Sequence, residues 1–258
     1  MSLHIIVCIK SVVKATAGGV AQRTPENSQL NPFDLPALEA AMRMKETMGG
    51  FVTAVSMGPA VSGESLTEAL AMGVDRAVLI SDPALKESDT FVTSRVLAAA
   101  VNRIGTYDLL FFGIRTADSD TGQVGPQTAA LLDIPFLGRV KQIDATSGSW
   151  TVQRIMDEWI ETWQVELPAA MTIDPRSFAP RHLGLDGISH AFEEPAIEDF
   201  SLTDLDLKIE AVGLPGSPTR VVAMKKIKRD RRCIMLEGDS RIQAAALMEH
   251  LTKAGVVG

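Results

Sequence analysis

The sequence predicts an α/β protein built on a doubly wound, mostly parallel sheet. Short apolar segments rich in β-branched or aromatic residues alternate with helical patterns up to about residue 135. The chain has 258 residues, enough for one large α/β domain with additions. A loop rich in Gly, Asp and Thr follows a fully apolar segment, residues 109–112, and open α/β sheets present backbone N–H groups to ligands in such loops.

The alternating part of the chain predicts a series of strands and helices. The expected strands are residues 3–10, 51–56, 76–80 and 107–112. Apolar residues spaced three or four positions apart predict the helices between them: Ala37, Ala41, Met44 and Met48; Leu66, Ala69 and Leu70; and Val92, Val96, Leu97 and Ala100. A further helical segment, residues 127–132, follows the loop. Helices on both faces of a parallel sheet follow from this order.

The pattern changes beyond residue 135. Residues 138–143, 150–156 and 159–166 predict successive hairpin strands, with a Thr-Ser-Gly-Ser turn at 146–149. Residues 167–173 predict one more buried strand, entered at Pro168, a position where proline is tolerated. We therefore expect a β-hairpin block at about residues 138–173.

The last part of the chain has the character of an arm. Residues 174–218 show little periodicity and contain five prolines, so we expect an extended path over the surface, with a solvated acidic stretch at 193–206. A basic patch at residues 225–232 precedes an amphipathic helix at roughly 240–254. We divide the chain into a main domain, 1–218, and a C-terminal arm and helix, 219–258, which we expect to pack on a partner.

Composition excludes several functional classes. The net charge of −7 argues against sequence-independent binding of nucleic acid, which needs a basic face. The apolar runs are of strand length, far too short for a membrane span, and we expect no signal peptide. Two cysteines form neither a disulfide framework nor a metal set, so we expect a cytoplasmic protein without a metal.

Four loops stand where a doubly wound sheet binds ligands, beyond the carboxyl ends of its strands. They contain Cys8, residues 31–34, Met57 and residues 113–124. Each also has a structural interpretation: Cys8 as core, Asp34 as a helix cap, Lys10 as a solvated side chain, and Asp118 and Asp120 as turn-forming residues. The candidate nucleotide-binding residues are Cys8, Asn31, Pro32, Phe33, Asp34, Met57, Gly113, Ile114, Arg115, Thr116, Ala117, Asp118, Ser119, Asp120, Thr121, Gly122, Gln123 and Val124.

Motifs along nearly the whole chain resemble the β subunit of electron transfer flavoprotein, including its FixA-type relatives. The most specific are Asn-Pro-Phe-Asp at 31–34 followed by residues 37–45, Ser-Met-Gly-Pro at 56–59, and the segment 69–76, which is close to the family's ALAMGADR. The loop at 118–126, the block at 165–172, and Pro180-Arg181 with Leu185, similar to the family's PRYxxL, continue the match.

The resemblance implies a Rossmann-like, adenine-nucleotide-binding fold and the role of an electron carrier subunit rather than a stand-alone enzyme. In the family, the α subunit holds most of the redox FAD and the β subunit binds AMP. Electrons pass by tunnelling between flavin dehydrogenases, such as the acyl-CoA dehydrogenase of fatty acid oxidation, and a downstream acceptor. An adenine fits an apolar slot at Cys8 and Met57, with a phosphate on the N–H groups of residues 121–125. Since phosphate repels carboxylates, we expect Asp118 and Asp120 to bond ribose or backbone.

The form of the loop leaves the nucleotide open. AMP-type members resemble DDDxNQTGQ, whereas residues 118–126 are closer to the DGDTAQVGP of FixA-like and electron-bifurcating members, where a second FAD replaces AMP. Arg23 stands where those members often carry an arginine. With a second FAD, NADH is the expected hydride donor and the complex splits its electron pair.

The segment after Pro180 resembles the family's recognition loop, which anchors a leucine in an acyl-CoA dehydrogenase. Leu185 occupies the anchor position, within a recognition loop at about 180–192. His182 replaces the usual tyrosine, and acidic residues replace the usual lysines, which affects the choice of partner more than the anchor itself.

Functions of other classes fit less well. A stand-alone ATP- or AMP-binding regulatory module shares the fold but lacks the hairpin block and the long tail. An adenylating ligase needs an SGGxDS-like loop after the first strand, which residues 11–19 lack. The four histidines pair with no convincing nucleophile, so hydrolysis is not expected either.

Overall fold

A computed structural model describes residues 2–14, 24–145, 149–193, 197–223 and 233–257. The chain forms two compact units, Met1–Arg220 and Val221–Gly258. The expected turn at 146–149 lies mostly outside the described residues. Arg23 and the basic patch at 225–232 lie outside them entirely.

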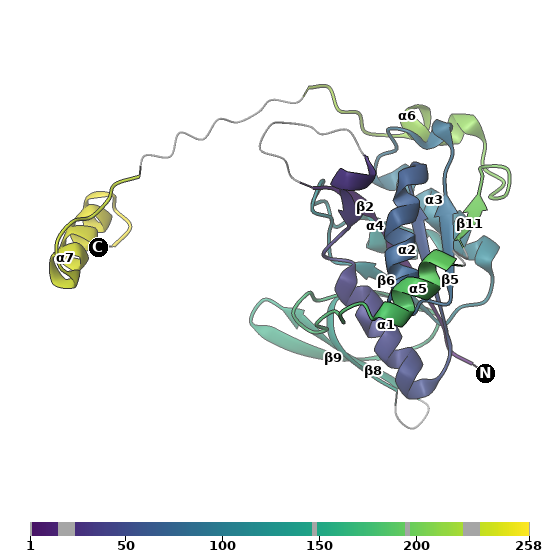
Figure 1. Cartoon of the computed structure of the whole chain (residues 1–258), viewed down its shortest axis with the longest axis horizontal. Helices are drawn as coiled ribbons and strands as arrows, with labels where there is room; N and C mark the ends of the chain where they lie inside the picture. The colour runs from purple at the N-terminus through teal and green to yellow at the C-terminus, as the bar shows by residue number, and fades with distance from the viewer. Residues whose placement is uncertain (1, 15–23, 146–148, 194–196, 224–232, 258) are drawn as a thin grey trace. The chain divides into compact units, whose positions relative to one another are not determined.

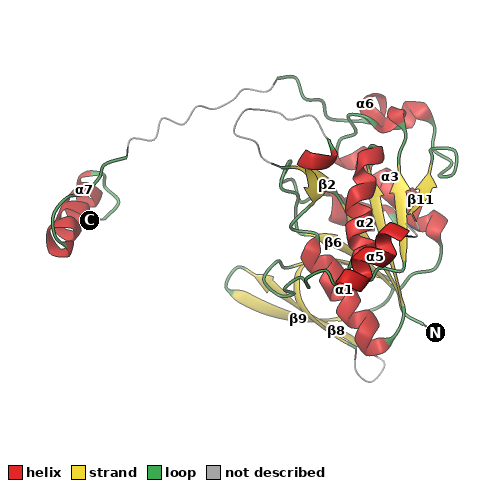
Figure 2. Ribbon diagram, viewed as in Figure 1, coloured by secondary structure: helices red, strands yellow, loops and turns green. Residues whose placement is uncertain are grey.

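The first unit is built on a nine-stranded sheet in the order β11-β5-β4-β1-β6-β10-β7-β8-β9 (Figures 1 and 2). Its strands are β1 (His4–Ile9), β4 (Phe51–Met57), β5 (Arg76–Ile80), β6 (Leu109–Gly113), β7 (Phe136–Asp144), β8 (Trp150–Met156), β9 (Trp159–Val165), β10 (Ala169–Ile173) and β11 (Ile197–Phe200). All neighbours from β11 to β7 pair in parallel, and β7, β8 and β9 pair antiparallel. The predicted doubly wound sheet with a β-hairpin is therefore confirmed.

Helices cover both faces of this sheet. The main helices of the first unit are α1 (Leu35–Met48), α2 (Gly63–Ala71), α3 (Thr90–Ile104), α4 (Val124–Leu131) and α5 (Leu185–Glu193). Buried residues of α1, α2 and α5 share one apolar cluster, and those of α3 and α4 share the other. Figure 1 looks onto the face covered by α1, α2 and α5. Side chains of β1 alternate between the two clusters, with Ile5, Val7 and Ile9 in the first and Ile6 and Cys8 in the second.

Shorter elements complete the first unit. They are the two-stranded sheet of β2 (Ser11–Val13) and β3 (Ser28–Leu30), the 3₁₀ turns η1 (Pro25–Asn27), η2 (Ala60–Ser62), η3 (Pro83–Leu85) and η4 (Ile209–Ala211), and α6 (Gly213–Gly216). The sequence did not predict β2 and β3, because three-residue strands carry almost no periodicity.

The expectation of an extended path over residues 174–218 is wrong for two segments. Residues 185–193 form α5, and residues 197–200 form β11, which adds to the parallel sheet beside β5. The acidic stretch at 193–206 is likewise not simply solvated, because Phe200, Leu202 and Leu205 are buried in the second cluster. Each of these apolar side chains stands between polar neighbours, which hides the pattern in a short window.

The second unit contains α7 (Ser240–Lys253), at the expected position. The carboxylate of Asp239 accepts hydrogen bonds from the N–H groups of Arg241 and Ile242, at 3.0 and 2.9 Å, and so caps the helix. Its apolar side chains Ile242, Leu247 and Met248 are exposed.

Candidate functional site

The strand order predicts a ligand site at the carboxyl ends of β1 and β6. These strands pair directly, yet the chain leaves β1 toward β4 on one side and reaches β6 only after β5 and α3. The connections therefore diverge at this point, and in open α/β sheets ligands bind where they diverge. The loop after β6 and the Asn-Pro-Phe-Asp turn before α1 meet there.

Asn31 joins these two loops. Its buried side-chain amide donates to the Asp34 carboxylate at 2.8 Å and to the Arg115 carbonyl at 2.9 Å. Its side-chain oxygen accepts a hydrogen bond from the Ala117 N–H at 3.1 Å. The backbone N–H of Asn31 donates to the Lys10 carbonyl at 2.9 Å, so the end of β1 is tied to the same residue.

Asp34 occupies the N-cap position of α1, but its carboxylate does not cap the helix as the sequence suggested. The carboxylate accepts instead from the Lys10 N–H, at 2.7 Å, and from Asn31. It also accepts from the Gly113 N–H. A side chain at Gly113 has no room, since a Cβ there would lie 2.1 Å from Asp34 Oδ1 and 2.6 Å from the Phe33 carbonyl oxygen. The glycine at the end of β6 therefore allows the two loops to come this close.

Burial determines the ionisation of Asp34. It raises the pKa of this carboxyl to about 7, although hydrogen bonds from Lys10 and Asn31 act in the opposite direction. Nearby Cys8 is buried as well, and its pKa is raised chiefly by burial and further by Asp34. Cys8 is therefore a neutral thiol in the core cluster beneath the loops, rather than a reactive group.

The two acidic residues of the loop pair with basic side chains. Asp118 Oδ1 lies 2.9 Å from Lys10 Nζ, and Asp120 Oδ1 lies 3.2 Å from Arg115 Nη1. The expectation that Asp118 and Asp120 bond ribose or backbone stays a prediction, whereas Lys10, interpreted from the sequence as a solvated side chain, forms an ion pair while 35% exposed. Burial would raise the pKa of Asp118, but the hydrogen bond and charge of Lys10 lower it. Each carboxylate is thus paired with a cation, which reduces the repulsion that would otherwise oppose an anion.

The loop is shaped by positive backbone angles and by stacking. Asp120 and Gly122 have φ values of 56° and 62°, and the Asp120 N–H donates to the Thr116 carbonyl at 3.0 Å. The guanidinium of Arg115 lies 4.5 Å from the centre of the Phe33 ring, a cation–π contact that joins the loop to the Asn-Pro-Phe-Asp turn.

The loop ends at the N-terminus of α4. Within the described part of the chain, the backbone N–H groups of residues 121–125 have no hydrogen-bond partner. Gln123 stands at the N-cap position without capping the helix, because its side-chain oxygen accepts from the Thr90 hydroxyl at 3.0 Å. Unpaired N–H groups at the positive end of a helix dipole suit a phosphate.

The family follows from comparison with known proteins. Residues 18–205 match the model of the electron transfer flavoprotein domain. The chain belongs to the electron transfer flavoprotein family. The resemblance read from the sequence motifs is therefore confirmed.

Three relatives show which members of the family this chain resembles. The chain is 35% identical over 230 residues to the electron transfer flavoprotein subunit beta of Thermoanaerobacterium thermosaccharolyticum, covering 89% of this chain and 88% of the relative. It is 38% identical to the caffeyl-CoA reductase-Etf complex subunit CarD of Acetobacterium woodii, over 85% and 86% of the two chains. It is 34% identical to protein FixA of Azorhizobium caulinodans, over 97% and 94%. The chain is accordingly an electron transfer subunit of the beta or FixA type.

The structure brings several of the predicted site residues into contact, with differences in role. Asn31, Phe33, Asp34, Gly113, Arg115 and Ala117 contact one another directly. Met57 packs, partly buried, against the second cluster, to which Cys8 belongs. Lys10 ends the first predicted loop, after β1, but is not among the candidate nucleotide-binding residues. Its position directly after the apolar strand, opposite an acidic loop, is the signal that could have identified it.

Leu185 lies apart from this cluster, at the start of α5 rather than in a loop. Its side chain is 85% exposed, and Phe192 at the other end of α5 is 73% exposed. Between α5 and α2 lies a groove of about 750 Å³, lined by Val61, Ala71, Leu183, Ile188 and Phe192 among others. The groove is also lined by Glu64, Thr67 and Glu68, so it combines apolar and polar side chains.

None of the helices in the described segments is long and apolar enough to cross a membrane. In those same segments, no group of three or more His, Cys, Asp or Glu side chains is placed to hold a metal ion.

The raised pKa of Asp34 predicts a pH dependence of stability. The folded chain holds a proton on Asp34 up to about pH 7, whereas an unfolded aspartate loses it near pH 3.9. The contribution of Asp34 to stability is therefore full below about pH 4 and is lost as the pH rises through 7. Urea unfolding of the wild type and of Asp34→Asn measures this. The difference in unfolding free energy should fall by about 1.4 kcal/mol per pH unit between these limits.

The matched control is Asp120→Asn, which removes an exposed carboxylate from the loop but leaves Asp34 in place, so the fall in stability attributed to Asp34 should remain. A wild-type profile parallel to that of Asp34→Asn from pH 4 to 7 would contradict the protonated state of Asp34.

Proposed function

We propose that this chain is the β subunit of a heterodimeric electron transfer flavoprotein and binds an adenine nucleotide, AMP or a second FAD, where β1 and β6 end. The observation that carries the proposal is the set of unpaired N–H groups at residues 121–125, next to a loop whose acids are already balanced by Lys10 and Arg115. A phosphate at this position would accept hydrogen bonds from the unpaired N–H groups, beside carboxylates that are already paired with cations.

The residues of this chain would bind and orient the nucleotide. The phosphate would lie on the start of α4 and accept hydrogen bonds from the N–H groups of residues 121–125. The adenine would lie against the apolar end of β1 and β4, near Cys8 and Met57. FAD, when held mainly by the α subunit, supplies the electron-carrying chemistry. The chain itself contributes scaffold, nucleotide and docking surface, which fits an electron carrier subunit rather than an independent enzyme.

A second candidate is an electron-bifurcating subunit with its own FAD that oxidises NADH. The sequence of residues 118–126 favours it, because the Val-Gly-Pro ending is that of the FixA-like form. Relatives named FixA and a subunit of a caffeyl-CoA reductase complex point the same way. In either case we place the protein in the cytoplasm, in keeping with its two free cysteines.

The nucleotide content of the purified heterodimer distinguishes these proposals. The complex is denatured, and the released nucleotides are separated and quantified. Equal amounts of FAD and AMP support the AMP-binding subunit, and twice as much FAD without AMP supports the bifurcating one. FAD in a single equivalent with no other nucleotide would contradict both, and ATP bound by the chain alone would favour a stand-alone regulatory module.

Strand β9 forms an exposed edge of the sheet that suits the binding of a partner subunit. Strand β9 is the last strand of the sheet, and its side chains Trp159, Ile160 and Trp163 are exposed. It contains neither proline nor lysine, the residues that commonly protect a sheet edge. We propose that the α subunit covers this edge, and that it also receives the C-terminal arm, whose helix α7 exposes apolar side chains.

Substitution of both tryptophans tests the subunit contact. Trp159→Lys combined with Trp163→Lys should raise the dissociation constant of the two subunits by at least about 30-fold, because aromatic anchors in an interface are worth about 2 kcal/mol or more. Ile209→Lys, at an exposed apolar residue of η4, serves as the control. Equal association of all three proteins by sedimentation would contradict the assignment of this edge.

We propose that Leu185 is the anchor for an acyl-CoA dehydrogenase-type flavoenzyme. Leu185→Ala should raise the KM for the heterodimer, as electron acceptor of the dehydrogenase, at least about tenfold with flavin content unchanged. Ile209→Ala removes a similarly exposed apolar side chain elsewhere and should have no effect. A KM equal to that of the wild type in Leu185→Ala would refute the docking role.

A further inference from the structure

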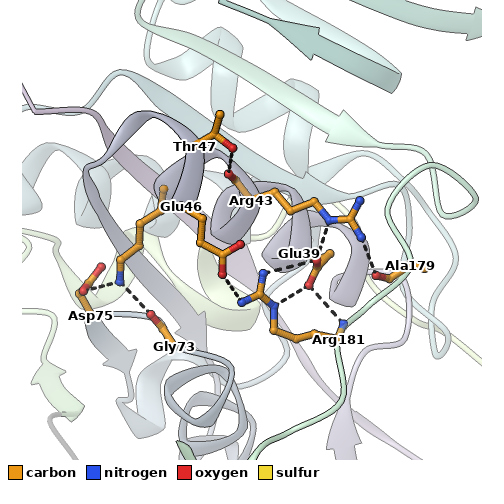
Figure 3. A network of polar contacts seen from close by, with 9 residues as sticks. Glu39, Arg43, Glu46, Thr47, Gly73, Asp75, Ala179 and Arg181 are labelled. Carbon is orange, nitrogen blue, oxygen red and sulfur yellow. Dashed lines mark hydrogen bonds and ion pairs between the residues drawn. The ribbon is translucent and has the colours of Figure 1, made fainter.

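The segment that carries Leu185 is fastened at its base to helix α1 by Arg181 (Figure 3). The guanidinium of Arg181 donates to Glu39 Oε2 through Nε at 2.8 Å and to Glu46 Oε1 through Nη1 at 2.5 Å. The backbone N–H of Arg181 also donates to Glu39 Oε2, at 3.2 Å. Residues 180–192, which carry Leu185, are called the docking segment below. One residue of it, Arg181, thus binds two carboxylates that lie two turns apart on α1.

Glu39 is an uncommon partner, because its side chain is only 4% exposed. Arg43 shares it, donating through Nε to Glu39 Oε1 at 2.7 Å. Burial by itself would raise the pKa of Glu39, but the hydrogen bonds from Arg181 and Arg43 lower it, so the carboxylate is charged. A buried charge held by two guanidiniums is costly to leave unpaired, which makes the position of Arg181 well defined.

The chain just before Arg181 lies along the same helix. Arg43 Nη2 donates to the Ala179 carbonyl at 3.4 Å, and the guanidinium lies 5.9 Å from the centre of the Phe178 ring. Figure 3 shows Arg43, Glu39 and Glu46 directed from α1 toward this segment. The hydrogen bonds to Asp75 and Gly73 come from Lys45, also on α1, and lead away from the segment.

Helix α5 has a second point of attachment. Gly187 approaches α2 so closely that a Cβ there would lie 2.3 Å from the Ala71 carbonyl oxygen. Arg181 and Gly187 therefore flank the exposed Leu185 on either side in the sequence. With both points held, the position of the Leu185 backbone relative to α1 and α2 is constrained.

The helix that Arg181 grips also forms the nucleotide site. Asp34 precedes α1 directly, and Glu39 follows Asp34 by five residues, which corresponds to about 8 Å along the helix axis at 1.5 Å per residue. A single rigid element thus carries the Asn31–Asp34 contacts at its start and the Arg181 contacts further along.

We propose that Arg181 is a positioning residue, which holds the docking segment on α1 through Glu39 and Glu46 and so presents Leu185 at a set place relative to the nucleotide site. The inference rests on the docking role proposed for Leu185 and adds the residue that orients it. A guanidinium is needed, because its planar fork reaches both carboxylates at once, whereas an ammonium of lysine offers one point of charge.

Arg181→Lys tests the proposal in the full-length chain, co-expressed with its flavin-binding partner subunit. The lysine retains a positive charge for the buried Glu39, so the protein should fold and keep its nucleotide. The assay follows reduction of the heterodimer by an acyl-CoA dehydrogenase-type flavoenzyme and its acyl-CoA substrate. The KM for the heterodimer should rise on the order of tenfold, with kcat within about twofold of the wild type, since only the encounter geometry is changed.

Lys45→Gln is the matched control. Lys45 lies on the same helix and forms an ion pair at 2.6 Å with Asp75, outside the docking segment. It should leave both kinetic constants unchanged. Hydrogen exchange gives an independent reading: the amides of residues 185–193 should exchange faster in Arg181→Lys and at the wild-type rate in Lys45→Gln.

The two proposals fail in different ways. An unchanged KM in Arg181→Lys, beside a raised KM in Leu185→Ala, overturns the positioning role and leaves the docking role standing. If neither variant changes the KM, docking at Leu185 is refuted, and hydrogen exchange alone tests whether Arg181 holds the segment on α1. Faster exchange then supports the Arg181 clamp, and unchanged exchange overturns it.

Discussion

The carboxamide of Asn31 is the contact on which the site depends. It donates to Asp34 and to the Arg115 carbonyl, and it accepts from the Ala117 N–H, so both of its ends are used. Because the group is buried, each of these bonds would cost about 1–3 kcal/mol if a partner were left unpaired. The amide therefore fixes the loop after β6 against the start of α1, and this contact brings the candidate phosphate site into register with the ends of β1 and β6.

Helix α1 connects the candidate nucleotide site with the docking segment. At its start, Asp34 receives N–H groups from Lys10 and Gly113, and farther along, Glu39 and Glu46 hold Arg181. The two buried carboxylates, Asp34 and Glu39, are stabilised in different ways. Asp34 gains a proton as its pKa rises, whereas Glu39 stays charged because two guanidiniums surround it. The nucleotide site and the docking segment share one support without sharing a residue.

The sequence predicted the sheet well, because its inner strands are continuous apolar runs separated by helical periodicity. It also placed the Asn-Pro-Phe-Asp turn and the 113–124 loop together, since both lie in connections that start from the carboxyl ends of sheet strands, β1 and β6. It could not show that Asn31 bonds to residues 84 and 86 positions away, because such contacts leave no local pattern. The cap expected from Asp34 failed for a similar reason: the Lys10 N–H, distant in sequence, holds its carboxylate.

Helix α5 shows a different limit. Leu185, Ile188 and Ala191 have helical spacing, but Gly187 and the nearby prolines favour an irregular segment in a sequence-based view. The glycine is present because α5 must approach the Ala71 carbonyl, so tertiary packing overrides its low helix propensity. The pairing of Arg181 with Glu39 likewise spans 142 residues, and only the folded chain reveals it.

The most direct test of this account is nucleotide retention in Asn31→Ala, with Asn102→Ala on the exposed face of α3 as the control. The heterodimers are purified alike, and the dissociation constant of the nucleotide bound by this subunit is measured by equilibrium dialysis. The account predicts weakening of at least about tenfold in Asn31→Ala, because the loop after β6 loses its two hydrogen bonds to this side chain and Asp34 loses a third, and no change in Asn102→Ala. Equal affinity in Asn31→Ala and the wild type would contradict the central role of this amide.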